Sequence, residues 1–366
     1  MNKKLYWFTP SVGKKEAKYV NEVINLNYPN QGRITKKLEK NISKLLNVKY
    51  AIATTSGTMS IYLALKALGV GKNDKVVVPN ITFVATANAV EMTGAEVVLA
   101  DIDKNNLGIC IDSLKKIISK NKVKAIIPVH ISGRNSNILE IVKFAKKRNI
   151  KIVEDAAEAF YSKNGNHFLG TLGDMGCFSF SPNKIITTGQ GGMVVTNNKK
   201  LYLFLLKLKD QGRVGKVTGG DDKHVCVGYN FKFTNILSAV GLAQLSQLKK
   251  RKKKMISIYK IYEKNLKTSK DFKLFPFNLK NGELPLWTDA YSTKRNKLIL
   301  KLEKKSIECR KFWKPLNLLD TYKKSFKFFP NSKTYLNKLF WLPSSFEMTK
   351  KDVLRVCNEI NKANKF

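Results

Sequence analysis

The sequence predicts an α/β fold with a large domain on a mainly parallel sheet and a small C-terminal α+β domain. Two observations carry this prediction. Short apolar runs alternate with helical segments through the first half of the chain, which is typical of βαβ units. From about residue 265 the chain continues in short mixed elements and two terminal helices. With 366 residues, 43% of them hydrophobic, we expect a large domain over 1–250 and a small one over 251–366.

The elements follow in order. Apolar residues at helical spacing predict helices over 14–27, 34–47, 60–69, 111–120, 137–149 and 199–212. Apolar runs predict strands over 50–56, 74–80, 95–102, 123–130, 150–156, 177–181 and 191–197. A Gly- and Asp-rich loop follows at 212–222, then one long helical pattern over 234–267. The terminal helices are expected over 295–305 and 351–362.

The chain is strongly basic, with 67 Lys and Arg against 27 Asp and Glu, a formal net charge of +40. Such a charge attracts polyanions, but the lysines are spread over nearly every predicted helix, so we expect no nucleic-acid partner. The densest run, "KKRKKK" at 249–254, fits a solvated helix face. No apolar run approaches a membrane span, and five scattered cysteines without a CxxC pair favour reduced thiols in a cytoplasmic protein.

Candidate binding residues stand at the carboxyl ends of the predicted strands, where open parallel sheets bind ligands. Ser56, Gly57 and Thr58 follow the first apolar run and open a helix. Glycine permits close backbone approach, hydroxyls donate hydrogen bonds, and a helix N-terminus offers free N–H groups. These residues form either a phosphate site or an ordinary helix N-cap.

Asp155 and Lys184 also follow strands, and each has two interpretations. Asp155 precedes two alanines and would either hold a cationic nitrogen or cap a helix. Lys184 lies in a Gly- and Thr-rich segment. It is either a partly desolvated amine that attacks carbonyl groups or a solvated loop lysine. Phe83 would stack on a ring or belong to the core. A phosphate cradle, a carboxylate and a Schiff-base lysine together match what pyridoxal 5'-phosphate (PLP) requires of a protein.

An ordered set of sequence blocks resembles the sugar-nucleotide aminotransferases, the DegT/StrS family of fold-type-I PLP enzymes. The resemblance runs from about residue 10 to 265 and continues more loosely to the end. Its blocks are "TTSGTMSIYLAL", "VPNITFVATANAV", "IIPVHISGR", "VEDAAEAF", "LGDMGCFSFSPNKIITTGQGGMVVTN" and "GYNFKFTNILSAVGLAQL".

The resemblance implies an aspartate-aminotransferase-like fold and a role for each matching residue. Lys184 would bond covalently to the cofactor and then move a proton, and Asp155 would pair with the pyridine nitrogen. Glu158 would lie near the ring's 3' oxygen or the sugar, and Asn230 would reach the phosphate of the neighbouring subunit, which requires a homodimer. The remaining cofactor contacts would be the phosphate-binding Ser56, Gly57, Thr58 and Ser179 and the ring-stacking Phe83.

Substrate contacts are expected from basic side chains, because the guanidinium fork suits carboxylates and phosphates. The candidates are Arg134, Arg213, Lys232 and Arg310, with surface salt bridges as the alternative for the arginines. The chain departs from many relatives at Gln190, Lys232 and Asn317, where Glu, Arg and His are common. His130 either lines the pocket or is structural, and the three histidines suggest no metal site.

Related PLP dehydratases carry His where this chain has Lys184, so the resemblance favours transamination. It is nearest to the branch, including perosamine synthases, that aminates C4 of 4-keto-6-deoxy sugars for surface polysaccharides such as O-antigen. L-Glutamate would be the donor and GDP-4-keto-6-deoxymannose the favoured acceptor, with UDP- or dTDP-linked 3- or 4-keto sugars as alternatives. Two alternatives stay open. The protein could carry out other PLP chemistry, such as dehydration, or it could be a regulatory or nucleic-acid-binding protein that lost catalysis.

Overall fold

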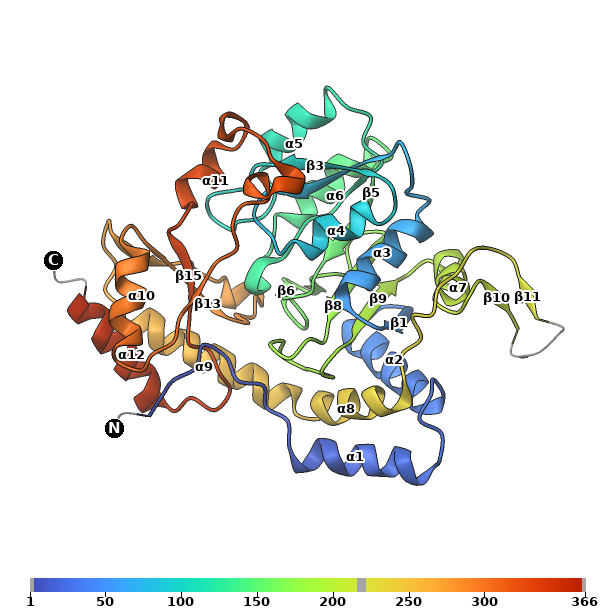
Figure 1. The fold of residues 1–366 in the computed structure, drawn as a ribbon, viewed down its shortest axis with the longest axis horizontal. Helices are drawn as coiled ribbons and strands as arrows, with labels where there is room; N and C mark the ends of the chain where they lie inside the picture. The colour runs from blue at the N-terminus through green and yellow to red at the C-terminus, as the bar shows by residue number, and fades with distance from the viewer. Residues whose placement is uncertain (1–2, 216–221, 364–366) are drawn as a thin grey trace.

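The computed structural model describes residues 3–215 and 222–363 and has a seven-stranded sheet at its centre (Figure 1). The strand order is β1-β9-β8-β5-β4-β2-β3. β9 runs antiparallel to both of its neighbours, and the other neighbouring strands are parallel. The strands are β1 (Tyr50–Thr54), β2 (Lys75–Pro79), β3 (Glu96–Ala100), β4 (Ala125–Ile126), β5 (Lys151–Asp155), β8 (Met175–Ser179) and β9 (Gly192–Thr196).

Helices cover both faces of this sheet because its strands are apolar on both sides. Along β2, for example, Val77 packs in one apolar cluster, and Val76 and Val78 pack in the other. One face is covered by α2 (Arg33–Leu46), α5 (Ile111–Ile118) and α6 (Ile138–Lys146). The other face is covered by α3 (Gly57–Ala67), α4 (Ala85–Glu91) and α7 (Lys199–Leu208). This arrangement confirms the predicted α/β architecture.

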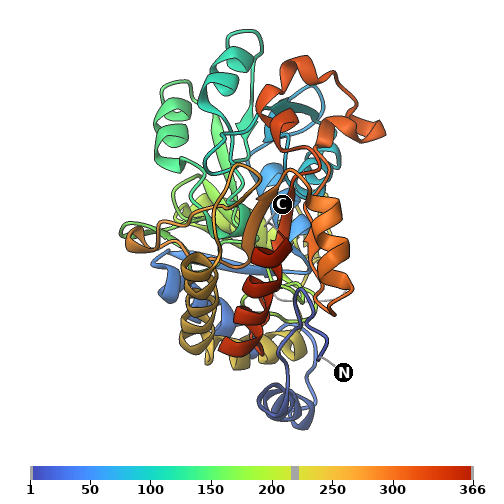
Figure 2. The same cartoon turned by 90° about the vertical axis from the view of Figure 1, so that its left-hand side faces the viewer.

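A second, antiparallel sheet is built from the C-terminal part of the chain in the order β12-β13-β15-β14. Its helices α9, α10 and α12 lie beside one another and share its apolar core (Figure 2). The elements are β12 (Phe272–Leu274), β13 (Thr288–Ser292), β14 (Arg310–Lys311), β15 (Leu339–Leu342), α9 (Leu248–Asn265), α10 (Arg295–Glu303) and α12 (Lys350–Ala363). The predicted domain boundary between residues 250 and 251 falls inside α9 and stays a prediction.

The single helix predicted over 234–267 is wrong in one respect, because the structure divides it into α8 (Asn235–Leu245) and α9. The break at Ser246 and Gln247 lies where the chain is bonded to a distant helix. The amides of Gln244 and Gln247 both donate to Oε1 of Glu16, at 2.9 Å each, which fastens the turn to α1 (Lys14–Asn25). α1 packs along α8 at the lower edge of the molecule (Figure 1).

The remaining elements are short. They are the 3₁₀ turns at Ile131–Gly133, Leu279–Asn281, Leu316–Leu318, Asp320–Tyr322 and Phe326–Phe328, helix α11 (Pro330–Tyr335), and the hairpins β6–β7 (Lys163–Asn164, His167–Phe168) and β10–β11 (Arg213–Val214, Lys223–His224). The β10–β11 hairpin projects from the body of the molecule (Figure 1).

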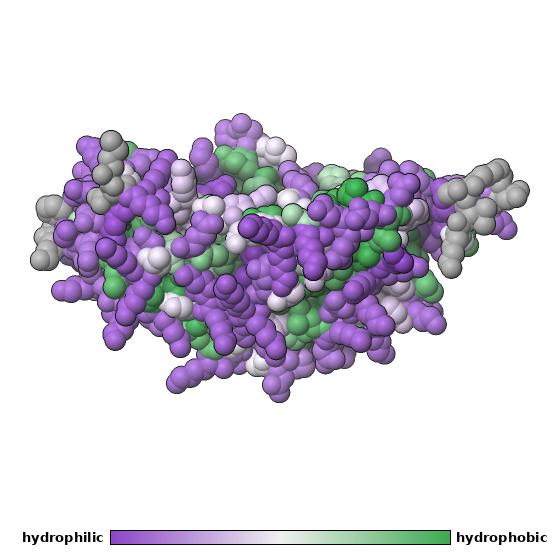
Figure 3. All heavy atoms as spheres, turned by 90° about the horizontal axis from the view of Figure 1, so that it is seen from below, coloured by the Kyte–Doolittle hydropathy of each residue, from purple (hydrophilic) through white to green (hydrophobic). Residues whose placement is uncertain are grey.

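The face seen from below carries hydrophilic side chains over its whole extent, with apolar groups interspersed (Figure 3). Among the described residues, no helix has the length and apolar character needed to cross a bilayer.

Candidate active site

A cavity of about 510 Å³ gathers most of the predicted site residues. It opens where β5 and β8 end, the place where open α/β sheets hold ligands. The predicted residues that line it are Ser56, Gly57, Thr58, Phe83, Asp155, Glu158, Ser179, Lys184 and Arg310.

The N-terminus of α3 forms one wall. Ser56 caps the helix, because its hydroxyl accepts the N–H of Met59 at 3.2 Å. Gly57 lies so close to β8 that a Cβ there would approach the Cβ of Ser179 to 2.9 Å. Ser56 is therefore an N-cap, and together with Gly57 it forms a close-packed helix end whose free N–H groups suit an anion.

Asp155 is a buried carboxylate at the end of β5. Its Oδ2 accepts the hydroxyl of Thr86 at 2.7 Å, and its Oδ1 accepts the N–H of Ala157 at 3.1 Å. Burial raises the pKa of this carboxyl, and the hydrogen bonds and the positive charge of Lys184 oppose that rise. Within residues 3–215 and 222–363 it makes no ion pair. A buried carboxylate of this kind suits a cationic partner brought by a ligand.

Lys184 faces Glu158 across the cavity. Its Nζ is 3.4 Å from Oε1 of Glu158 and 4.8 Å from the ring centroid of Trp287. The other oxygen of Glu158 accepts the N–H of Ser132 at 2.9 Å. Burial raises the pKa of the Glu158 carboxyl, and Lys184 opposes that rise. The amine is mostly enclosed, with one long charge contact, so it is available to a ligand.

Sequence reasoning missed an aromatic wall. The chain has four tryptophans, and Trp7, Trp287, Trp313 and Trp341 all line this cavity. Their rings form one group, with centroids 5.3 Å apart for Trp7 and Trp287 and 5.1 Å apart for Trp287 and Trp341. They are far apart in sequence and resemble core residues, so no local pattern indicates them. Thr86, in contrast, stands three residues after Phe83, in the same strand-end segment that the sequence marks as a candidate binding region.

The comparisons with known proteins agree with this geometry. The model of the DegT/DnrJ/EryC1/StrS aminotransferase family matches residues 10–361. The chain belongs to this family.

Two relatives are called GDP-perosamine synthase. The protein from Escherichia coli O157:H7 is 35% identical over 97% of both chains, and that from Vibrio cholerae is 32% identical over 96% of both. A Helicobacter pylori aminotransferase involved in the biosynthesis of pseudoaminic acid is 25% identical in its solved structure. It superposes with a TM-score of 0.91 over 98% of this chain and 99% of that one. The predicted aminotransferase fold is therefore confirmed.

Four predicted residues of this aminotransferase lie outside the cavity. Arg134 is buried, and its guanidinium donates to Asp289 and to the carbonyl of Pro276. Arg213 pairs with Asp222 in the projecting hairpin, at 3.4 Å, and Lys232 pairs with Asp210 at 2.7 Å. The exposed Asn230 follows the same hairpin, away from this chain's own cavity. Within this chain the three cations therefore contact carboxylates outside the cavity.

Two polar side chains in the aminotransferase have structural partners. His130 is fully buried, and its Nε2 lies 2.9 Å from Glu154, which fits the structural alternative. Asn317 is bonded through its amide to Asn80 and to the carbonyl of Lys324, both at 2.9 Å. Gln190 lines the cavity. Within the described ranges, no group of three or more His, Cys, Asp or Glu residues is placed to hold a metal ion.

Proposed function

We propose that this member of the family is a PLP-dependent aminotransferase acting on a nucleotide-linked keto sugar. The observation that carries the proposal is the meeting of three groups in one 510 Å³ cavity: the amine of Lys184, the buried carboxylate of Asp155 and the N-terminus of α3. PLP requires these three partners, for its aldehyde, its pyridine nitrogen and its phosphate. The residues present therefore fit the cofactor.

Each group has a role that its surroundings support. When bound, PLP would supply an aldehyde for a covalent bond to Lys184 and a ring that withdraws electrons. Asp155, held by Thr86 and the N–H of Ala157, would keep the pyridine nitrogen protonated. The free N–H groups of α3, with the hydroxyls of Ser56, Thr58 and Ser179, would hold the phosphate. Phe83, half-exposed at the rim, would cover the ring.

Lys184 would also be the base of the reaction. Its Nζ, when unprotonated, would accept the proton that leaves the α-carbon of glutamate. Glu158, 3.4 Å away, would stabilise the ammonium that results. The aromatic wall would exclude water from this transfer.

The proposed acceptor is a 4-keto-6-deoxy sugar linked to GDP, with L-glutamate as donor. Its support is that the relatives from E. coli O157:H7 and V. cholerae, both named GDP-perosamine synthase, cover nearly the whole chain. A UDP- or dTDP-linked keto sugar is the second candidate.

The test is a spectrum of the protein reconstituted with PLP. We expect the visible absorption of the bound cofactor to disappear on addition of glutamate and to return with GDP-4-keto-6-deoxymannose. Because all four tryptophans line the cavity, loading with PLP should also quench the intrinsic fluorescence. A visible band that persists with glutamate would contradict transamination.

We further propose a homodimer in which Asn230 of one subunit contacts the cofactor phosphate of the other. The exposure of Asn230 and the projection of the hairpin before it support this arrangement (Figure 1). Mixing the Lys184→Ala and Asn230→Asp proteins under conditions of subunit exchange should restore about a quarter of the wild-type activity, because half of the dimers would carry one intact site. No recovery after verified exchange would exclude the contact.

A further inference from the structure

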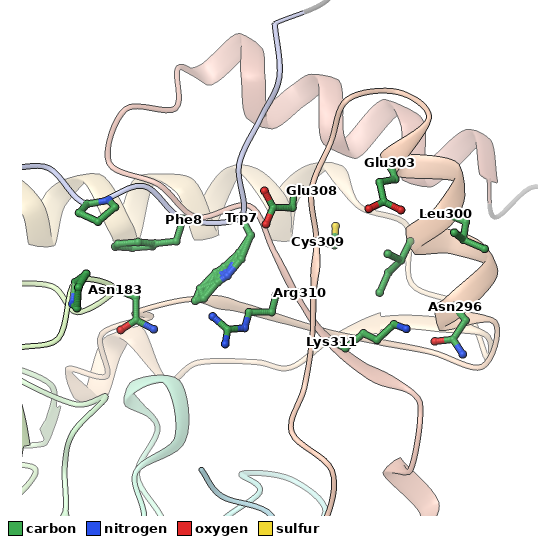
Figure 4. A pocket seen from close by; sticks show the side chains of 13 residues that line it. Trp7, Phe8, Asn183, Asn296, Leu300, Glu303, Glu308, Cys309, Arg310 and Lys311 are labelled. Carbon is green, nitrogen blue, oxygen red and sulfur yellow. The ribbon is translucent and has the colours of Figure 1, made fainter. Parts of the chain in front are cut away.

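A second cavity, of about 910 Å³, adjoins the first (Figure 4). The two share Trp7, Asn183 and Arg310 as lining residues. From this shared edge the second cavity extends between the small sheet and α10. A ligand that placed a sugar beside Lys184 would therefore have room to continue past Arg310 into this space, whose volume suits a nucleoside diphosphate.

The charged groups of the second cavity are unpaired. Arg310, Lys311, Glu303 and Glu308 line it, and none of them makes an ion pair with another described residue. The guanidinium of Arg310 instead lies 4.7 Å from the ring centroid of Trp7. In Figure 4, Arg310 and Asn183 lie near Trp7, and Glu303 lies at the opposite side of the cavity with Leu300 and Asn296. Arg310 thus lies at the end next to the first site, where Glu308 also lies beside Trp7, and Glu303 lies at the far end, toward which Lys311 extends.

One face of α10 forms the far wall. Asn296, Ile299, Leu300 and Glu303 follow helical spacing and all line the cavity. Leu300 is 58% exposed, so this face offers an apolar surface between two polar groups. The carbonyl oxygen of the Asn296 amide accepts two hydrogen bonds from Arg295, at 3.1 and 3.0 Å, which leaves the NH₂ group of Asn296 as the donor.

We propose that this cavity binds the guanosine diphosphate part of the sugar nucleotide and that Glu303 selects the base. The inference rests on the proposed function, because it requires the sugar to lie beside Lys184. Arg310 binds the diphosphate at the edge shared with the first cavity. The guanine ring lies on Leu300, with the carboxylate of Glu303 accepting from its N1–H and exocyclic NH₂.

The selection follows from the donors and acceptors of the bases. Guanine presents two adjacent N–H donors to a carboxylate, which accepts hydrogen bonds only. Uracil and thymine present one N–H between two carbonyl oxygens, so a carboxylate that meets their edge faces acceptors. The NH₂ of Asn296 complements guanine O6, which is an acceptor. Glu303 therefore favours guanine and disfavours pyrimidines through the same contact.

The experiment measures the dissociation constants of GDP and UDP for the PLP-loaded enzyme by calorimetry. We expect wild type to prefer GDP, and Glu303→Gln to weaken GDP binding about 10- to 100-fold with little change for UDP, the range of one hydrogen-bonded charged contact. Arg310→Met should weaken both nucleotides alike, because both carry the diphosphate. Glu140→Gln, at an exposed position of α6, removes the same charge far from the cavity and should change neither.

Three results would overturn the inference: no preference for GDP in wild type, equal effects of Glu303→Gln on both nucleotides, or loss of the preference through Glu308→Gln instead. Glutamate is added to the same wild-type preparation. If its visible band does not respond, the proposed function fails. If the band responds normally and the base preference is absent, only the assignment of this cavity fails.

Discussion

Two ion pairs, Lys184–Glu158 and Arg134–Asp289, share Ser132 as a hydrogen-bond partner. The backbone N–H of Ser132 donates to Glu158 at 2.9 Å, and its hydroxyl donates to Asp289 at 2.8 Å. Ser132 has a left-handed backbone with φ of 53°, which the two carboxylates help to hold in place. The pairs are neighbours built from the same types of charge, but their cations have different surroundings.

The difference lies in how fully each cation is satisfied. Arg134 bonds to Asp289 and the carbonyl of Pro276, and stacks 3.9 Å from the ring centroid of Phe277. Lys184 has one long contact with Glu158 and faces a cavity. A cation that is hydrogen-bonded through each of its nitrogens, as Arg134 is, stabilises a fold, whereas a cation with one long contact can bind a ligand. The comparison predicts that removing each cation damages a different property of the protein.

The largest expected effect is on activity. Lys184→Ala should lower transamination at least about 10⁴-fold, about 5 kcal/mol of barrier, because the covalent link and the base are lost together. We expect a normal unfolding transition, since the side chain has few partners. Activity is measured by 2-oxoglutarate release and stability by urea unfolding. Lys200→Ala, an exposed lysine on α7, is the control, and turnover retained by Lys184→Ala would refute its role.

The next largest effect is on stability. Arg134→Met should cost about 3–5 kcal/mol of unfolding free energy, because it leaves Asp289 buried without its cation. Urea unfolding measures this, and the double variant Arg134→Met/Asp289→Leu should recover much of the loss. Arg134→Met protein that is as stable as wild type but fails to bind glutamate would reverse the comparison and make Arg134 a substrate residue.

The sequence predicts the architecture well, and it also predicts that Asp155 and Lys184 lie in one cavity, because both features depend on local signals. Strand ends carry Asp155 and Lys184, and alternation of apolar runs with helices indicates the sheet that brings these ends together. The sequence predicts the role of Arg134 less well, because Arg134 follows a strand, as Asp155 and Lys184 do. Its contact with Asp289, which is 155 positions away, is not visible in the sequence. The surroundings of Arg134 are therefore set by its partner in the folded chain and not by its position after a strand.

Long-range contacts are also the reason why the sequence does not predict the aromatic wall or the break between α8 and α9. Trp7 and Trp341 are at opposite ends of the chain and meet only in the folded structure. The break depends on Glu16, which is distant in sequence from both glutamines it binds. Contacts of this kind are set by packing of whole elements, and no spacing within one segment encodes them.

A smaller effect is expected when the buried carboxylate of Asp155 is removed. Burial raises the pKa of Asp155, so this carboxyl favours the fold fully only below its unfolded pKa of about 3.9, and that contribution is lost as the pH rises through the raised value. Without cofactor, Asp155→Asn should therefore unfold at a higher temperature than wild type at pH 7, with a difference that shrinks toward pH 4. Thermal unfolding across this range measures it. A difference that grows on acidification would contradict the assigned direction.

The smallest expected effect concerns Thr86, which lines the cavity and donates a hydrogen bond to Asp155. Thr86→Val keeps the shape and removes the 2.7 Å hydrogen bond, so the pKa of Asp155 should rise further and its hold on the pyridine nitrogen should weaken. We expect about a tenfold loss in kcat/KM, the value of one such bond, with the acid limb of the pH profile moved to higher pH. Thr93→Val is the matched control, because that buried hydroxyl bonds to the carbonyl of Val90 at the far end of α4. A loss shared by both variants, with no movement of the pH profile, would show that Thr86 acts through packing alone.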